Sequence, residues 1–329
     1  MRILVVGSYK RWRMESGVAR ALIRAGHEVK LLDDRRMKRV MGRRMTQWWT
    51  RRAVSRFKPE TVIVGKCLGL ELETVAEIVR GRRSRMWNLD GPWYGKERPE
   101  QTHIDGVGKL VDVCFVNGFE ESWRARGVPA RFLPAAADRD IVPTMPDPAF
   151  RSDVAFTGTG YDEARAAFLT EVAKHCQLRV WGLGWERWRE QVNWSGRPVE
   201  DVAFSKVCSS TSIMLGALPA PMKVATLSAS NRMWITILAG GFFLGAHTPG
   251  IDRLLKGGEH CAWYRDLNDC IAKIKYYLGY PKEREKIRVA GLKYVREHHT
   301  FDQRIEHLLS GKPYISPLDR PRVISESSE

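Results

Sequence analysis

Residues 228–304 constrain the fold more than any other part of the sequence. Polar Ser230 and Asn231 precede an apolar run that ends at a Gly-Gly pair, which is the pattern of a helix with a polar amino-terminal cap and a glycine at its carboxyl end. A short apolar strand, FFLGA, follows, and helix and turn signals then alternate to the end of the segment. The unpaired amides at the start of the helix form an anion site beside Arg232. This order predicts half of a nucleotide-binding α/β domain.

The amino-terminal part of the chain predicts a second α/β unit. Its apolar runs indicate buried strands at Ile3–Val6, Glu28–Leu32, Thr61–Val64, Met86–Leu89 and Val113–Val116. Helical patterns separate these runs, so we expect a parallel sheet. Gly7 follows the first strand, but the next residues, SYKRWRMESG, lack the GxGxxG pattern of a dinucleotide site. A dehydrogenase is therefore disfavoured.

A proline-bearing segment, PTMPDPAF, divides the two units. We expect an N-terminal Rossmann-like domain over residues 1–140 and a C-terminal Rossmann-like domain over residues 151–310. The second domain opens on the strand DVAFTG, a turn of small residues and the helix DEARAAFLTEVAKH. Residues 311–329 form a tail, and we expect disorder from about Ser316.

Several motifs in this order resemble the CgeB-like glycosyltransferases, which belong to the GT-B class. They include FLPAAAD, DVAFTGTGYDEARAAFL, VWGLGW, the Arg-led helix with its Gly-Gly break, PGID, WYRD and IKYYLGYPKEREKIRVAGLKYVREHHT. The resemblance is strongest over residues 132–309. It implies an α/β GT-B fold, with two Rossmann-like domains that face a central cleft, the second for a nucleotide-sugar donor and the first for the acceptor. It also implies that the final helices, from about Leu267, cross back onto the first domain.

The helix start and the strand ends supply the expected donor-binding residues. Arg232, with Ser230 and Asn231, is expected to hold the diphosphate of a nucleotide sugar, UDP-linked, with no metal and no other cofactor. A plain helix cap with a surface arginine is the alternative. The other expected donor residues follow strands: Gly158, Thr159, Trp181, Gly182 and Gly7. Turn chemistry and packing explain these glycines and their neighbours equally well.

The sequence departs from the family pattern at one position in this region. Relatives often carry a Glu three residues after the helix-leading Arg, where it can hold the ribose. Here that position is Ile235. Another group must therefore bind the ribose of a nucleotide-sugar donor.

Asp90, in MWNLDGPWYG, is the candidate catalytic base of an inverting enzyme. It follows an apolar strand, precedes a Gly-Pro turn and lies among aromatic residues suited to an acceptor or a sugar. CgeB-like proteins have a similar Asp-Pro neighbourhood. The alternative is that Asp90 only caps the turn. Ser8, Tyr9 and Lys10 are expected on the opposite wall of the cleft, and a retaining enzyme would need no such base.

The formal net charge of +16 is concentrated in one segment. Residues 35–58 hold ten cations, no acid and a Trp-Trp pair. A basic acceptor domain indicates an acidic acceptor, and nucleic acid fits best because arginines pair with phosphates while aromatic rings stack on bases. Anionic membrane lipid or glycan and a solvated basic helix are the alternatives. The expected acceptor-binding residues are Arg43, Arg44, Trp48, Trp49, Arg51 and Arg52.

Weaker signals come from three other groups of residues. Asp138 and Asp140 form a DxD-like run, but they lie in the interdomain linker, where we expect solvated acids and no metal. His298 and His299 end a helix, where polar or cationic side chains interact with the helix dipole. Three tryptophans suit either packing or a platform for a sugar or a base: Trp185, Trp188 and Trp194.

Composition limits the cellular setting. No apolar run approaches the roughly 20 residues of a membrane helix, and the chain opens on a strand rather than a signal peptide. Its six cysteines form no CxxC pair, so neither zinc nor a disulfide framework is expected. We expect a soluble, cytoplasmic protein.

Two functions follow from these observations. The first is a GT-B glycosyltransferase that moves a sugar from a nucleotide sugar to a hydroxyl group. Its favoured acceptor is DNA with a hydroxymethyl pyrimidine, by analogy of fold and charge with bacteriophage DNA modification, and the alternative is an anionic cell-surface or lipid acceptor. The second function is a non-catalytic nucleic-acid-binding protein on a GT-B scaffold.

Overall fold

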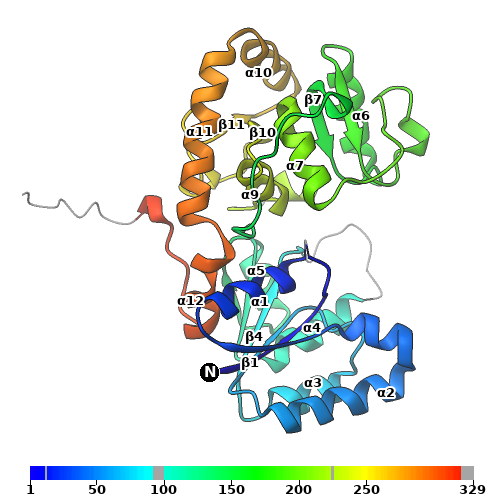
Figure 1. Ribbon diagram of the computed structural model, residues 1–329, viewed down its shortest axis with the longest axis vertical. Helices are drawn as coiled ribbons and strands as arrows, with labels where there is room; N and C mark the ends of the chain where they lie inside the picture. The colour runs from blue at the N-terminus through cyan, green and yellow to red at the C-terminus, as the bar shows by residue number, and fades with distance from the viewer. Residues whose placement is uncertain (12, 92–99, 224–225, 320–329) are drawn as a thin grey trace, which may run out of the picture.

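Two parallel β-sheets, each flanked by helices, make up the protein (Figure 1). The structure is a computed structural model, and it describes residues 1–11, 13–91, 100–223 and 226–319. All of the strand pairings between named strands are parallel. Within each sheet the carboxyl ends of the strands therefore lie along one edge, where ligands bind in α/β proteins.

The N-terminal sheet has the strand order β2-β1-β3-β4-β5-β6. Its strands are β1 (Arg2–Val6), β2 (Glu28–Leu32), β3 (Thr61–Val64), β4 (Arg83–Asn88), β5 (Val113–Val116) and β6 (Ala130–Phe132). The connecting helices are α1 (Met14–Arg24), α2 (Asp34–Phe57), α3 (Leu72–Val79), α4 (Gln101–Leu110) and α5 (Glu120–Ala125). Alternate residues of β1 enter different cores: Leu4 packs with residues of α2, α3 and α4, and Ile3 with residues of α1. Both faces of this sheet are therefore covered.

The C-terminal sheet has the order β11-β10-β9-β7-β8. Its strands are β7 (Ser152–Thr157), β8 (Leu178–Trp181), β9 (Thr211–Gly216), β10 (Phe243–Ala246) and β11 (Ala262–Tyr264). Its helices are α6 (Glu163–Ala173), α7 (Asp201–Ser210), α8 (Ala220–Lys223), α9 (Asn231–Leu238), α10 (Leu267–Gly279) and α11 (Pro281–His298). Helix α6 begins where the sequence predicts, because the Asp162 side chain accepts a hydrogen bond from the amide of Arg165 at 2.7 Å.

The last helix, α12 (Phe301–Ser310), returns to the N-terminal domain and packs against α1 (Figure 1). The ring of Phe301 lies so close to Gly17 that a β-carbon there would be 2.3 Å from it. Phe301 also makes an edge contact with Trp87, with ring centroids 5.9 Å apart. The return of the chain agrees with what the family resemblance implies.

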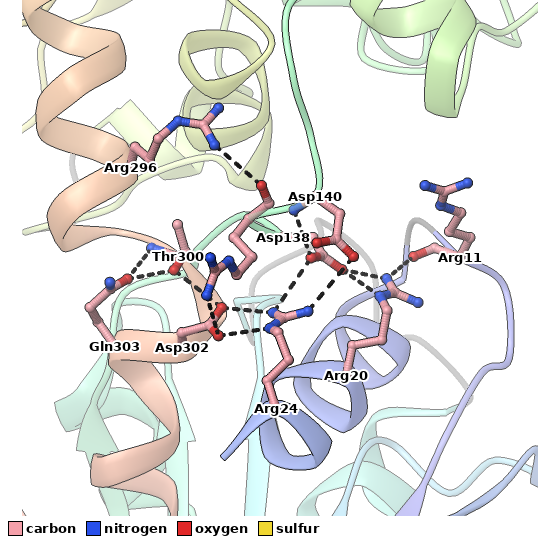
Figure 2. Close-up of polar contacts among 10 residues, drawn as sticks. Arg11, Arg20, Arg24, Asp138, Asp140, Arg296, Thr300, Asp302 and Gln303 are labelled. Atoms are coloured by element: carbon pink, nitrogen blue, oxygen red, sulfur yellow. Dashed lines mark hydrogen bonds and ion pairs between the residues drawn. The ribbon is translucent and has the colours of Figure 1, made fainter. Parts of the chain in front are cut away.

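The two connections between the domains are bonded to each other. The amide of Ala137 donates to the carbonyl of His299 at 3.1 Å, and the amide of Phe301 donates to the carbonyl of Ala137 at 2.9 Å. Asp138, which the sequence predicts to be solvated, is only 7% exposed and accepts from Arg20 Nε at 2.7 Å. Arg24 lies between Asp138 and Asp302 and donates two hydrogen bonds to Asp302, at 2.9 and 2.7 Å (Figure 2). Asp138 is therefore a structural ion-pair partner, whereas Asp140 is exposed as expected, with its carboxylate 3.7 Å from Arg24.

Two further expectations at this end of the chain need correction. His298 and His299 end helix α11 as the sequence predicts, but His299 is not a cation there. It is fully buried, its ring stacks on Trp234 with centroids 4.2 Å apart, and burial lowers its pKa well below the ordinary value. Disorder does not begin at Ser316, since that residue is buried and Asp319 pairs with Arg253 at 2.7 Å. The remaining tail residues, 320–329, lie outside the described residues.

Candidate functional site

The turns after β7 and β8 pack directly on each other, which explains their glycines. A β-carbon on Gly182 would lie 1.8 Å from the carbonyl oxygen of Gly158, and Gly182 has a φ of +143°, which favours glycine. The amide of Gly158 donates to the carbonyl of Trp181 at 2.8 Å. Thr159 follows as an exposed residue. The two predicted glycine turns thus form one surface at the carboxyl edge of the C-terminal sheet.

The tryptophans near these turns pack in the core, and two of them donate hydrogen bonds to the carbonyls of the turns. Trp181 is 2% exposed and packs on Phe150, so its side chain lies in the core instead of facing a donor. Trp185 is fully buried and donates to the carbonyl of Gly158 at 2.7 Å, while Trp194 donates to the carbonyl of Gly182 at 2.8 Å. Trp185 is therefore no sugar platform.

Helix α9 directs its amino terminus and Arg232 at the same surface. The Ser230 hydroxyl caps the helix by accepting from the amide of Arg232 at 3.3 Å. The guanidinium of Arg232 lies 5.3 Å from the Phe156 ring and 3.0 Å from the point where a Gly158 β-carbon would be. The structure therefore brings Ser230, Asn231, Arg232, Gly158 and Gly182 together, as the sequence analysis expects of a donor site.

A small cavity opens beside this helix start. The hydroxyl oxygen of Ser228 and the amide oxygen of Asn231 are buried and have no hydrogen-bond partner among the described residues. Buried polar atoms normally have a partner, and Ser228 lines the cavity, so its hydroxyl is suited to a bound polar ligand. The cavity is lined by Gly216, Ala217, Leu218, Ser228, Ala229, Ser230, Arg232, Met233, Phe243, Gly245, Ala246, Ile251 and Trp263.

Ile235 lies in apolar surroundings. It packs against a core cluster that includes Phe150, Trp181 and Ala239. A carboxylate in this environment would lose its hydration without gaining a partner. The departure from the family pattern at this position therefore has a packing explanation.

Asp90 lies at the carboxyl end of β4 and forms an ion pair with Lys66, which follows β3. The adjoining Gly91 contacts the ring of Phe119, within 2.7 Å of where its β-carbon would lie. Next to Phe119, the Asn117 side chain donates to the carbonyl of Ala229 at 2.6 Å. The segment of residues 117–119 thus contacts both Gly91, which follows Asp90, and Ala229, which lines the cavity. Residues 92–99, which hold the aromatic neighbours predicted beside Asp90, lie outside the described residues.

Glu15 is a second carboxylate at this edge, and the sequence analysis misses it. Its side chain fills the space above two strand-end glycines: a β-carbon on Gly7 would be 2.2 Å from Glu15 Cγ, and one on Gly65 would be 2.8 Å from Oε1. Burial raises the pKa of Glu15 and outweighs the opposing effects of Arg13 and Lys66. Gly7 thus accommodates Glu15, which is a different role from the predicted donor contact. A glycine after each of two neighbouring strands was the available signal.

Ser8, Tyr9 and Lys10 form a folded turn directly after β1. The Ser8 carbonyl accepts from the Ser16 hydroxyl at 2.7 Å, and its hydroxyl accepts from the Lys10 amide at 3.2 Å. The Tyr9 amide donates to Asp33 at 3.0 Å. The turn is therefore held against α1 and the end of β2.

The basic segment is helix α2, which bends at Gly42, where φ is +78°. Trp48 and Trp49 are 49% and 43% exposed, and Arg52 lies over the Trp48 ring at 5.3 Å. Two of the predicted acceptor residues are already paired: Arg43 with Glu71 at 2.6 Å and Arg51 with Glu77 at 2.5 Å. Arg44 and Arg52 are exposed, and no carboxylate among the described residues pairs with them.

The structure adds two observations on metals and membranes. Within the described ranges, no group of three or more His, Cys, Asp or Glu side chains is placed to hold a metal ion. None of the helices that the structure describes is long and apolar enough to cross a membrane. All six cysteines are unpaired thiols.

Comparison with known proteins agrees with this architecture. Residues 165–310 match a family model described as glycosyl transferase-like. Sucrose-phosphate synthase from Thermosynechococcus elongatus is similar at a TM-score of 0.65 and 10% identity, over 94% of this chain and 98% of that chain. HepE from Anabaena, solved in complex with UDP-glucose, has a TM-score of 0.65 and 11% identity, over 95% of this chain and 100% of that chain. The fold is GT-B.

The GT-B fold confirms the expected architecture of two parallel-sheet Rossmann-like domains. A glycosyltransferase from Rickettsia africae has the same fold, with a TM-score of 0.64 and 9% identity over 94% of this chain and 97% of that chain. The family match and the GT-B fold together support a glycosyltransferase enzyme. No curated protein sequence matches the chain. The CgeB-like affiliation stays a prediction.

Proposed function

We propose that this GT-B protein transfers a sugar from a UDP-linked donor to a hydroxyl group of DNA that carries a hydroxymethyl pyrimidine. The observation that carries the donor half is the convergence of Arg232 and the capped start of α9 on the glycine turns after β7 and β8. HepE, which shares the fold, was solved with UDP-glucose, and this supports a UDP-linked donor. The motifs support placement within the CgeB-like group.

The donor diphosphate would bind at the start of α9. Main-chain amides at a helix start and a guanidinium both stabilise negative charge, and this charge grows on the diphosphate as it leaves the sugar. Ser228 lines the cavity and supplies a buried hydroxyl without a partner among the described residues. This hydroxyl can both accept and donate a hydrogen bond. Ser228 is our candidate to replace the family Glu in binding the ribose or the sugar.

The proposed reaction is a direct displacement. The acceptor oxygen forms a bond to the anomeric carbon while the bond between that carbon and the phosphate oxygen breaks, and the diphosphate leaves with the electron pair. In an inverting reaction, the hydroxyl proton passes to a carboxylate, which we assign to Asp90. The ion pair with Lys66 holds the Asp90 carboxylate at the end of β4. Glu15 is the competing base at the same edge.

Helix α2 supports an acidic acceptor. Its exposed cations attract phosphates, and the exposed Trp48 and Trp49 offer aromatic faces for unpaired bases. A hydroxymethyl pyrimidine inside a duplex would have to leave the base stack to reach a carboxylate at a strand end, as in other enzymes that modify bases. Single-stranded or locally opened DNA is therefore the proposed substrate form.

Thermal unfolding tests the donor half of the proposal. UDP and UDP-glucose should raise the melting temperature of the full chain. At a ligand concentration one hundred times the dissociation constant, the free energy of unfolding should rise by about 2.7 kcal/mol. Arg232→Gln should weaken this effect, whereas Arg80→Gln, at an exposed position after α3 in the other domain, should retain it. If neither nucleotide stabilises the protein, the non-catalytic nucleic-acid-binding function gains support.

A further inference from the structure

A cationic groove lies where helix α2 begins. It is lined by Arg35, Lys38, Arg39, Leu68 and Glu100 and has a volume of about 400 Å³. Three elements meet here, because α2 starts two residues after β2, Leu68 lies in the loop after β3, and Glu100 directly precedes α4. The groove is therefore at the carboxyl edge of the N-terminal sheet, the edge that also carries Asp90 and Glu15.

The cations of this groove differ from others on the same helix. Among the described residues, no carboxylate forms an ion pair with Arg35, Lys38 or Arg39, whereas Arg43 and Arg51 are paired with glutamates. The Lys38 ammonium makes a long hydrogen bond, 3.5 Å, to the carbonyl of Leu68. One acid, Glu100, faces three cations, so the groove has an excess of positive charge. A phosphate group has the charge and the oxygen atoms to satisfy these donors.

One short loop, which follows β3, links the groove to the candidate base Asp90. Lys66, which pairs with Asp90, is two residues from Leu68, a reach of about 7 Å even in extended chain. The neighbouring Gly69 amide donates to the buried Asp34 carboxylate at 2.6 Å, which fixes the loop against the start of α2. The loop after β3 therefore contributes both Leu68 to the groove and Lys66 to the ion pair with Asp90.

We propose that the groove formed by Arg35, Lys38 and Arg39 binds the phosphate next to the reacting nucleotide of the acceptor. This inference rests on the proposed function and adds the group that positions the acceptor. The distal half of α2 then contacts the strand farther away, because Trp48 is thirteen residues from Arg35 and lies beyond the bend at Gly42. The binding of a short strand should therefore depend more strongly on the groove than the binding of a long strand, which also contacts the distal half of α2.

The test compares two triple variants of the full chain. R35Q/K38Q/R39Q removes the groove cations, and K275Q/K282Q/K286Q removes three exposed lysines of α10 and α11 as a control with the same change in net charge. Fluorescence anisotropy measures binding of a four-nucleotide single strand that contains hydroxymethylcytosine, at several salt concentrations. The groove variant should bind at least tenfold more weakly, with a salt dependence reduced by about one phosphate contact. The control should stay within about twofold of the parent.

Equal weakening in both variants, or none in either, would overturn the proposal. Vesicles that contain phosphatidylserine form a second arm: groove-dependent binding to vesicles with no binding to the oligonucleotide would also overturn it, in favour of a membrane ligand. Stabilisation by UDP is recorded for every variant. An absence of UDP stabilisation in the parent protein would count against the proposed function. UDP stabilisation of the groove variant would show that its fold and donor site are intact.

Discussion

Two carboxylates at the edge of the N-terminal sheet compete for the acceptor proton in the proposed reaction. Asp90 is paired with Lys66, and Glu15 is removed from water above Gly7 and Gly65. With Asp90 as the base, Asp90→Asn should lower kcat by about 10²- to 10⁴-fold and leave UDP binding unchanged. A larger loss in Glu15→Gln would transfer the role to Glu15. As the pH is lowered, the rate would then begin to fall at a higher pH than for an ordinary glutamate, because the pKa of Glu15 is raised.

The side chain at Ile235 should act on stability and not on donor binding. Ile235→Glu places a carboxylate against Phe150 and Trp181 and should lower the free energy of unfolding by about 1–3 kcal/mol. Ile235→Val, the control, should lower the free energy of unfolding by about 0.5–1.5 kcal/mol. Chemical denaturation and UDP titration check both variants. Tighter binding of UDP by Ile235→Glu at unchanged stability would show that the family carboxylate can be restored.

His299 makes stability depend on pH in a defined direction. Burial and the nearby Arg304 lower its pKa well below the ordinary 6.5. The unfolded chain therefore takes up a proton on this imidazole near pH 6.5, which the folded chain does not, and stability should fall as the pH decreases through that value. His260 and His27 have pKa shifts in the same direction.

The variant His299→Gln keeps an oxygen that can accept from Arg304, which donates to His299 Nδ1 at 2.7 Å, but it cannot be protonated. Melting temperatures between pH 7.5 and 5.5 should fall less steeply for this variant than for the parent. Identical slopes would show that His299 does not contribute.

At the scale of elements, helix α2 should contact nucleic acid through its unpaired arginines. Arg44→Gln with Arg52→Gln should weaken binding of a twenty-nucleotide strand and lower the salt dependence, because both guanidinium groups are exposed. The matched pair Arg43→Gln with Arg51→Gln should have a smaller effect, because Glu71 and Glu77 already neutralise these charges. Trp48→Ala should weaken the free energy of strand binding by about 1–3 kcal/mol if a base stacks there. Equal effects of the two arginine pairs would point to a general charge effect.

Local patterns predict most elements, and they do so because each element is defined by its own residues. Strands β3 and β5 begin and end where the apolar runs predict, and Ser230 caps α9 as its sequence indicates. Glu15 could not be found in this way, because its environment comes from glycines after two different strands. Trp185 and Trp188 have similar sequence surroundings, but only the packed domain shows that Trp185 is fully buried.

At the scale of the whole molecule, Asp138 should hold the two domains in their relative position. It is 7% exposed and pairs with Arg20 of α1, next to the point where the two interdomain connections are bonded (Figure 2). Asp138→Asn removes the charge that Arg20 and Arg24 face and should lower stability by about 1–3 kcal/mol, less than for a fully buried pair because Arg20 is partly exposed.

Asp140→Asn is the control for this prediction. Its carboxylate is more exposed and lies 3.7 Å from Arg24, so the change should stay within about 0.5 kcal/mol. Thermal unfolding of both variants provides the comparison. A loss in Asp140→Asn as large as that in Asp138→Asn would contradict a specific role for Asp138.

The most direct test of sugar transfer to DNA is mass spectrometry of an oligonucleotide that contains hydroxymethylcytosine, incubated with the full chain and UDP-glucose or other nucleotide sugars. The proposed function predicts a mass increase of one sugar residue on that oligonucleotide, none on the same sequence with unmodified cytosine, and none with Asp90→Asn. An unchanged mass with every donor would contradict DNA as the acceptor. Release of UDP under the same conditions would then point to a different acceptor.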